Sequence, residues 1–222
     1  MYRDAVILIR LVSLVRVFGE QNLPFHGSSE RLYSSNSRNF LKFVKYLAEF
    51  GPIMKEHLHK VKNHVTFAHY LGKGIQNELI QLIASATQKK TIEVVQAAKY
   101  FSIILDCTPI VSHVEQMTMI IHFVDLGKNN EEMAGNIHTE KSEMTVREHF
   151  LGFILLKEAT GAFITDTILE KLHEVSLSVE NLCGQGFDNG SNMKDKDNGV
   201  QRRLLNINLR AYFVPCNTRN DQ

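Results

Sequence analysis

The chain has few cysteines, and this scarcity narrows the classes of protein to which it can belong. Its three cysteines, Cys107, Cys183 and Cys216, are widely separated. Scattered thiols in this number do not make a disulfide framework or a self-contained zinc site, both of which need more cysteines at short spacings. The cysteine content therefore indicates a reducing compartment.

The chain also lacks an excess of charge and a long apolar run. It carries 25 Lys and Arg against 24 Asp and Glu, so the whole-chain charge gives no sign of the strong positive field of many nucleic-acid-binding proteins. Any basic surface would have to be local. No apolar run reaches membrane-spanning length, so no membrane partner is expected. Residues 1–19 have the apolar content of a signal peptide, but Arg10 and Arg16 interrupt them, which favours a short amphipathic helix.

The chain contains enough apolar residues to form a core, because it has 222 residues, of which 44% are hydrophobic. Apolar residues at helical spacing predict helices over residues 36–51 and 74–100. The segment between them, residues 55–74, is rich in lysine and histidine. Its four histidines match no usual zinc spacing, so a solvated, weakly basic connector is the favoured interpretation, with metal ligands as the alternative. These histidines are His57, His59, His64 and His69.

After residue 100 the periodicity changes, and strands alternate with helices in a definite order. Three strands are predicted to form a meander, followed by a helix, a strand that breaks into a Gly- and Asn-rich loop, a second helix and a last strand. This order matches the ribonuclease H-like fold. We therefore expect an α/β domain with a ribonuclease H-like mixed sheet, truncated, and preceded by an α-helical region. The predicted strands cover residues 100–107, 115–125, 148–156, 181–187 and 210–216.

Two acids lie at the ends of strands that this fold would place side by side. Asp106 falls near the end of the first strand and Asp188 at the end of the fourth, and a helical crossover between parallel neighbours puts both ends at one edge of the sheet. Two adjacent carboxylates repel unless a cation lies between them, and oxygen ligands select Mg²⁺ or Mn²⁺. Alternatively, Asp106 caps a turn with Thr108, and Asp188 opens the Asp-Asn-Gly turn that the sequence contains. Spacing alone leaves both interpretations open.

The block "GQGFDNGSNM" and the segments "FSIILDCTPIVSHVEQMTMIIHFV" and "GFILLKEATGAFITDTILEKL" resemble, in sequence and in order, the catalytic domain of hAT-type transposases and their host-encoded relatives, which include MYM-type zinc-finger protein 1. The resemblance begins near residue 16 and extends over the rest of the chain. It implies two domains: an N-terminal helical region of a transposase-derived protein over residues 1–98, and a partial ribonuclease H-like transposase domain over residues 99–222. The segment "NFLKFVKYLAEF" also carries the resemblance, and "GQGFDNGSNM" is its most specific block.

The resemblance implies a chemistry for the two acids. In that family an Asp, Asp, Glu triad holds two metal ions for phosphoryl transfer on DNA, so Asp106 and Asp188 are expected to be the first two catalytic and metal-binding residues. The third acid follows a long inserted domain beyond the fifth strand, and this chain ends at Gln222 before it. A Cys-x-x-His pair is also expected after that strand; Cys216 matches, but Arg219 stands at the histidine position. Ile110 is a further departure, because many relatives have an acid there.

From the resemblance we expect a nuclear, domesticated or fragmentary transposase-derived protein that associates with DNA without sequence preference. Its ancestral activity is metal-dependent DNA strand cleavage and transfer, and this chain alone is expected to retain little or none of it. One alternative is a non-enzymatic module with protein partners, or a fragment without function of its own. Another is a part of an active transposase whose C-terminal half is missing from this sequence.

The remaining polar candidates have simpler interpretations. Asp125 and Asp166 are expected to be solvated, and Cys107 and Cys183 to be small core residues. A basic group near the last helix, Arg202, Arg203 and Arg210, fits phosphate contacts or an exposed helix face equally well. Without the helix that covers the sheet beyond the fifth strand in the family, apolar surface is expected to be exposed, or covered by the N-terminal helices, near Tyr212, Phe213 and Val214.

Overall fold

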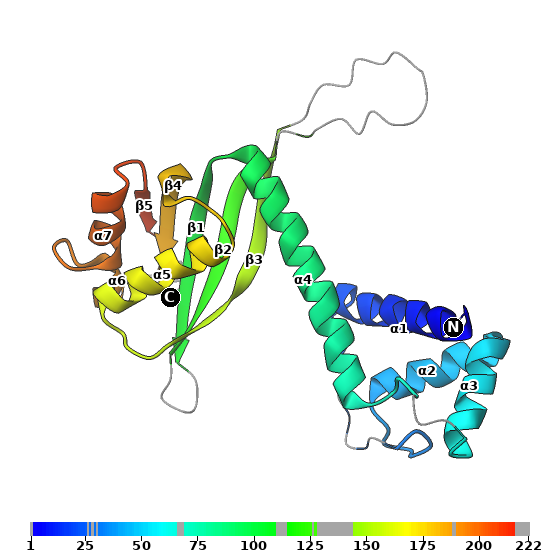
Figure 1. Ribbon diagram of the computed structural model, residues 1–222. Helices are drawn as coiled ribbons and strands as arrows, with labels where there is room; N and C mark the ends of the chain where they lie inside the picture. The colour runs from blue at the N-terminus through cyan, green and yellow to red at the C-terminus, as the bar shows by residue number, and fades with distance from the viewer. Residues whose placement is uncertain are drawn as a thin grey trace, which may run out of the picture. The chain divides into compact units, whose positions relative to one another are not determined.

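The computed structural model divides into two compact units, residues 1–87 and 88–222 (Figure 1). The division falls inside one long helix, α4 (Lys73–Ala98), between residues 87 and 88, whereas the boundary expected from the sequence, residue 98, is the last residue of that helix. None of the helices described is long and apolar enough to cross a membrane. The structure describes residues 2–25, 27, 29, 31–65, 69–109, 115–125, 127, 144–187 and 190–215.

The first unit is helical and has its own apolar core. Besides the start of α4, it contains α1 (Tyr2–Glu20), α2 (Asn39–Phe50) and α3 (Pro52–Lys62). Each of α1, α2 and α3 buries a stripe of residues spaced three or four apart, as an amphipathic helix does. The centre of this core includes Leu11, Phe18, Phe40, Val44 and Met54.

Helix α3 corrects the prediction of a solvated connector between the first helices. Pro52 begins the helix, where its missing N–H and fixed φ are tolerated. Met54, His57 and Leu58 are buried at helical spacing, so the segment has an apolar face despite its lysines. His57 is part of that face, and its Nε2 lies 2.8 Å from the carbonyl oxygen of His69. The contact assigns His57 a structural role.

The second unit contains a five-stranded mixed sheet, which confirms the predicted α/β class. The sheet order is β3-β2-β1-β4-β5, with β1, β2 and β3 antiparallel to one another and β4 parallel to both β1 and β5. The first strand is therefore central, as expected. The elements are β1 (Phe101–Pro109), β2 (Glu115–Asp125), β3 (Thr145–Leu156), α5 (Gly161–Glu174), the 3₁₀ turn η1 (Val179–Asn181), β4 (Leu182–Phe187), α6 (Ser191–Lys194), α7 (Val200–Ile207) and β5 (Tyr212–Pro215).

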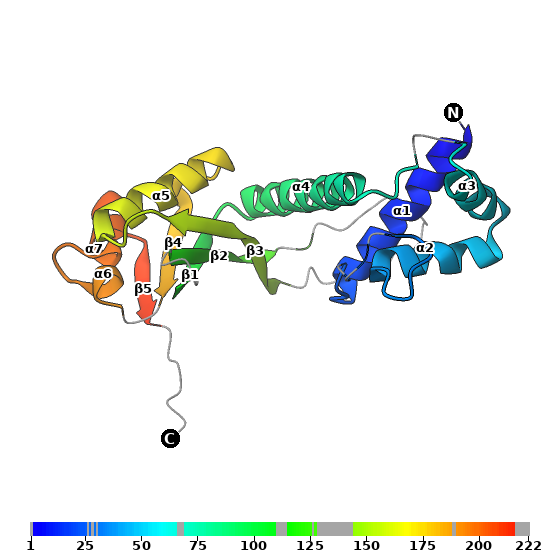
Figure 2. The same cartoon turned by 90° about the horizontal axis from the view of Figure 1, so that it is seen from below.

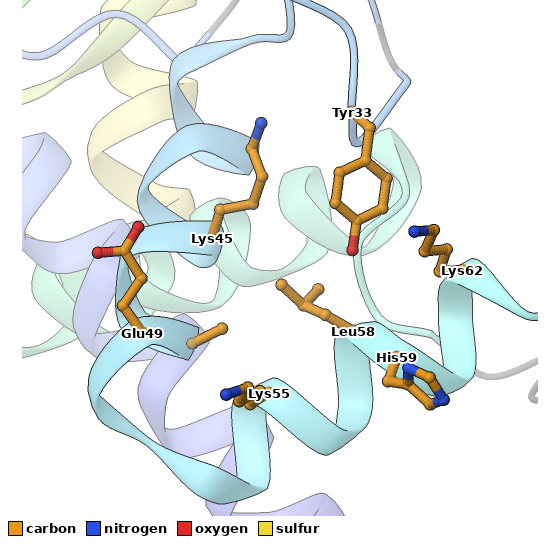
Figure 3. Close-up of a pocket in the computed structure, with 8 residues that line it drawn as sticks. Tyr33, Lys45, Glu49, Lys55, Leu58, His59 and Lys62 are labelled. Atoms are coloured by element: carbon orange, nitrogen blue, oxygen red, sulfur yellow. The ribbon is translucent and has the colours of Figure 1, made fainter.

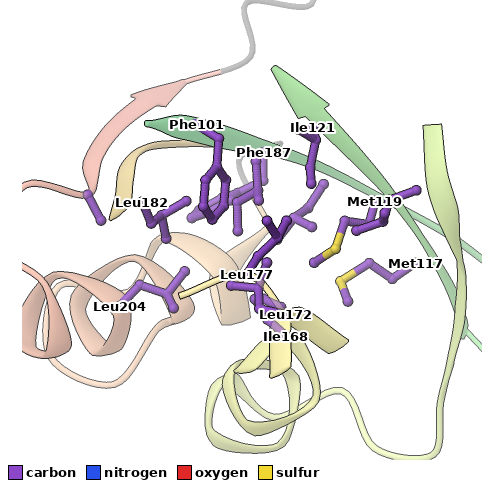
Figure 4. Close-up of a cluster of buried hydrophobic side chains, with 14 of the residues drawn as sticks. Phe101, Met117, Met119, Ile121, Ile168, Leu172, Leu177, Leu182, Phe187 and Leu204 are labelled. Atoms are coloured by element: carbon purple, nitrogen blue, oxygen red, sulfur yellow. The ribbon is translucent and has the colours of Figure 1, made fainter. Parts of the chain in front are cut away.

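One face of the sheet forms the core of this unit. Strand residues such as Phe101, Met119 and Phe187 pack there against Ile168 of α5 and Leu204 of α7 (Figure 4). The last part of α4 joins the same core through buried side chains at positions 92 and 95. Helices α5, α6 and α7 lie on the same side of the sheet (Figure 2).

The opposite face of the sheet is open within the described part of the chain. Phe150, Phe153 and Leu155 of β3 are each more than half exposed, and the first two rings touch, with centroids 4.8 Å apart. At the other edge, Tyr212 and Val214 of β5 are also exposed, as predicted. The expectation for the residue between them is wrong: Phe213 points to the core side, where its ring lies 4.8 Å from that of Phe187.

Close contact between β1 and β4 depends on a glycine. Gly184 pairs with Ser102, and a Cβ added to Gly184 would lie 2.5 Å from Ser102 Oγ and 3.0 Å from Ser102 Cβ. Gly186, two residues along the same strand, has more room, since its nearest neighbour would be 3.6 Å away. The two glycines therefore form a matched pair for testing the pairing of these strands.

We predict that Gly184→Ala lowers the free energy of unfolding by about 1–3 kcal/mol, because the added methyl group overpacks the β1–β4 contact. Gly186→Ala should have little effect, because its methyl group makes ordinary contacts. Urea unfolding of the two variants measures the difference. Adding Ser102→Ala should restore part of the loss caused by Gly184→Ala, and equal losses for the two glycine variants would contradict the predicted clash.

Candidate metal centre

Asp106 lies on the open face of the sheet. It belongs to β1, in which Phe101, Ile103 and Leu105 point into the core. Successive side chains of a strand point to opposite faces, so Asp106 points away from the core, and its side chain is exposed. Its cross-strand partner is Thr118 of β2, a neighbour that the sequence did not single out.

Asp188 lies outside the described residues, but the strand that leads to it is described. Phe187, the residue before Asp188, is the register partner of Leu105, the residue before Asp106. The two strands are parallel and adjacent, with α5 in the connection between β3 and β4. The prediction that the Asp106 strand is interior and lies beside the strand leading to Asp188 is therefore confirmed. The separation of the two carboxyl groups stays a prediction.

Buried amides fix β4 in its place. Gln185 donates hydrogen bonds from Nε2 to the carbonyl oxygens of Gln201 and Ala211, at 3.1 and 2.9 Å, which join β4 to α7 and to the residue before β5. Asn208 donates from Nδ2 to the carbonyl oxygen of Leu182 at 2.6 Å, at the start of β4. Both side chains are almost fully buried, so these bonds are shielded from water. They hold the strand that leads to Asp188 from its core side.

Carboxylate groups such as those of Asp106 and Asp188 are suitable ligands for a hard cation. Carboxylate oxygens are the ligands that Mg²⁺ and Mn²⁺ prefer, and an exposed position on a rigid strand leaves room for a hydrated ion. Among the described residues, no group of three or more His, Cys, Asp and Glu side chains is placed to hold a metal. A site of Asp106 and Asp188 would leave most of the coordination sphere to water, which implies weak binding.

Other acids have local roles in the structure. Asp125, at the end of β2, accepts a hydrogen bond from the backbone N–H of Gly127 at 3.1 Å and forms an ion pair with Arg147 Nε at 2.8 Å. Asp166 is exposed on α5. Asp125 is therefore paired, where solvation was expected, while the solvated role of Asp166 is confirmed.

The two described cysteines are reduced and half-buried. Cys107 packs against the sheet core, and the thiol of Cys183 donates to the carbonyl oxygen of Phe101 at 3.3 Å. Cys107 therefore agrees with the expectation of a small core residue, whereas Cys183 is half-buried and lies outside the apolar core cluster. Cys216, Ile110 and Arg219, which bear on the expected departures from the family pattern, lie outside the described residues.

Two of the three arginines near the last helix make structural contacts. Arg203 donates from Nε to the carbonyl oxygen of Asn198 at 2.9 Å. Arg210 donates to the carbonyl oxygen of Glu180, and its guanidinium carbon lies 5.6 Å from the centre of the Tyr100 ring. These contacts explain both residues without a phosphate. Arg202 is exposed on α7.

The fold defines a class: a mixed five-stranded sheet with a parallel β1–β4 pair and helices on one face is consistent with an RNase-like α/β domain. Residues 2–199 match the family model described as "ZMYM1/FAM200, RNase-like domain". This match covers most of the chain, so the protein belongs to the ZMYM1/FAM200 RNase-like family, a transposase-derived group. The match spans both compact units and includes the positions of both acids.

We predict that the chain binds Mn²⁺ weakly and that either Asp106→Asn or Asp188→Asn lowers the affinity by about tenfold or more, because each removes half of the carboxylate charge. Titration of Mn²⁺ followed by electron paramagnetic resonance of the free ion measures the affinity. Asp166→Asn removes an exposed acid elsewhere in the same unit and should leave it unchanged. Equal affinities in the wild type and in all three variants would exclude a shared site.

Proposed function

We propose that this protein is a DNA-associated relative of hAT-type transposases in which Asp106 and Asp188 form a remnant of the metal site. The observation that carries the proposal is the pairing of Leu105 with Phe187, since it places the strand that holds Asp106 beside the strand that leads to Asp188. The family match supports the same reading, because it covers both strands. A nuclear location follows from this proposal.

A bound Mg²⁺ or Mn²⁺ would supply an electrophile for phosphodiester chemistry. The chain's own contribution is to hold carboxylate oxygens rigidly on one face of the sheet, with Asp106 fixed by ladder pairing to β2 and by the neighbouring β4. Two carboxylates alone supply too few oxygen ligands to fix a second cation beside the first. We therefore propose that metal binding persists and that strand cleavage does not.

The distribution of charge supports DNA association through the first unit. Residues 1–87 carry 11 Lys and Arg against 6 Asp and Glu, a net charge of +5. Residues 88–222 carry 14 against 18, a net charge of −4. The near-neutral whole chain therefore consists of a basic and an acidic part. The basic part, residues 1–87, is the one expected to attract phosphate groups, and such electrostatic attraction agrees with non-specific DNA binding.

The second candidate function is a protein-interaction module. The exposed apolar residues of β3 favour it, because Phe150, Phe153 and Leu155 follow one another on one open face. In this reading the transposase fold is kept for binding another protein. A third candidate, part of an active transposase completed by further sequence, keeps the acids as catalytic residues.

We predict that the chain binds duplex DNA without sequence preference, that the logarithm of the affinity falls steeply with the logarithm of the salt concentration, and that Mn²⁺ does not lead to nicking of supercoiled DNA. Fluorescence anisotropy measures the DNA affinity and its salt dependence, and agarose-gel electrophoresis detects nicking. Asp106→Asn should leave DNA binding unchanged, since the acid is not a phosphate contact.

Two results would contradict this proposal. Nicking by the wild type that disappears in Asp106→Asn would show that the chain is an active nuclease. Absence of DNA binding at low salt would leave the interaction module as the better account.

A further inference from the structure

A pocket of about 520 Å³ lies in the first unit, between α2, α3 and the loop that precedes α2 (Figure 3). A volume of this size is within the range of pockets that hold small ligands. Apolar side chains from both helices contribute to its wall, and charged side chains surround them. The lining residues are Tyr33, Lys45, Ala48, Glu49, Lys55, Leu58, His59 and Lys62.

Helical spacing explains why these residues share one surface. On α2 the lining positions are 45, 48 and 49, and on α3 they are 55, 58, 59 and 62. Residues three, four and seven apart lie on the same side of a helix, so each helix contributes one continuous stripe. Both stripes have a small or apolar residue between charged ones, namely Ala48 and Leu58.

The pocket has an excess of uncompensated positive charge. Among the described residues that line the pocket there are three lysines, Lys45, Lys55 and Lys62, and one acid, Glu49. Within the described chain, no acid lies within ion-pair distance, 4.0 Å, of these lysines. The site therefore attracts an anion.

Neighbouring basic groups differ from the pocket lysines in having an acidic partner, which two of them share. Lys60 Nζ lies 2.9 Å from Glu56 Oε1, and Arg3 donates to the same oxygen at 2.6 Å. The Lys60 hydrogen bond, with the charge of Arg3, lowers the pKa of Glu56 from its usual value, so the carboxylate stays charged. Arg3 of α1 and Lys60 of α3 thus have an acidic partner, whereas the three lysines at the pocket are available to bind an anionic ligand.

An exposed aromatic ring stands among these ammonium groups. The side chain of Tyr33 is 57% exposed, and the ammonium nitrogens of Lys45 and Lys62 lie 5.8 and 5.4 Å from its ring centre. At an exposed site such cation–π contacts are weak, and a phosphate would compete with the ring for the two lysines. The ring would then be available for stacking.

We propose that this pocket binds one nucleotide unit of a single-stranded nucleic acid, with the base against Tyr33 and the adjoining phosphates on Lys45, Lys55 and Lys62. Aromatic rings interleaved with basic groups are how proteins bind single strands without sequence preference. A duplex keeps its bases stacked inside and offers only phosphates, so it cannot use Tyr33. An acidic peptide would use the lysines but leaves the ring without a stacking partner.

The proposal goes beyond the DNA association argued above, since it names a site and a strand state, and it is independent of Asp106. The experiment uses the full chain and a fluorescein-labelled twelve-nucleotide thymidylate, with anisotropy recorded over a range of salt concentrations. Neutralisation of the two phosphates that flank the bound nucleotide predicts a log–log salt slope of about −1.4. Changing Lys45, Lys55 and Lys62 together to Gln should bring that slope close to zero, and Tyr33→Ala should weaken binding about tenfold.

Matched variants distinguish binding at the pocket from general electrostatic attraction to the basic unit. Lys42 and Tyr46 are on α2 outside the lining, and Tyr46 is 56% exposed, almost as much as Tyr33. Lys42→Gln should lower affinity far less than Lys45→Gln, and Tyr46→Ala should leave it unchanged. Glu49→Gln should tighten binding, because it removes a carboxylate that lines the pocket. A gain of affinity also shows that the variant is folded, and thermal unfolding checks the others.

Three outcomes would overturn the proposal. One is no binding of the oligonucleotide at low salt. The second is equal losses for the Tyr33 and Tyr46 variants. The third is that a duplex of equal length binds at least as tightly as the single strand and that Tyr33→Ala changes the affinity for neither. That result would indicate a general polyanion-binding surface. In the second and third cases DNA association stands and only the pocket fails, so the two proposals can be told apart.

Discussion

The parallel pairing of β1 with β4 is the constraint on which the second unit depends. It requires the chain to leave the meander, cross through α5 and return beside its own first strand, and Gly184 allows the two strands to approach at Ser102. The pairing places Leu105 and Phe187 on the core face, where both are buried. Because strand side chains alternate between faces, the residue after Leu105 points to the other face. The core thus sets the direction in which Asp106 projects.

The described helices of this unit pack on the core face of the sheet, so none of them covers the face that carries Asp106. Asp106 shares its face with exposed Phe153, and Thr118 is the residue between them in the sheet register. A partner that covered the apolar residues of β3 would therefore come close to the carboxylate. The protein-interaction reading and the metal-site reading concern the same surface, whereas the basic charge belongs to the other unit.

Much of the fold could be predicted from the sequence, because the apolar periodicity of the strands and of α5 is strong and no competing feature obscures it. Helix α3 was missed because lysines and histidines dominate its composition, and its buried stripe at positions 54, 57 and 58 is short. The position of Asp106 near the end of β1 was predictable from the apolar run before it. Phe213 was misassigned because the strand is only four residues long and the direction of each side chain depends on register with β4.

The lysine and tyrosine pocket was beyond sequence reasoning for a different reason. The spacing of Lys55, His59 and Lys62 on one helix face can be read from the sequence once α3 is known. Tyr33, however, lies in a loop, and its closeness to Lys45 and Lys62 depends on how that loop packs on α2 and α3. A pattern within one element is local, whereas a site built from three segments requires the fold.

The central claim is that β1 and β4 bring Asp106 and Asp188 to a common cation. A crystal structure of the chain grown with Mn²⁺, with anomalous diffraction data to locate the ion, tests it directly. The account predicts an anomalous peak within reach of both carboxylates, whose separation is about 8 Å or less, because metal–oxygen bonds are about 2 Å long and paired ions lie about 4 Å apart. A clearly larger separation, or an ion bound by neither acid, would contradict it.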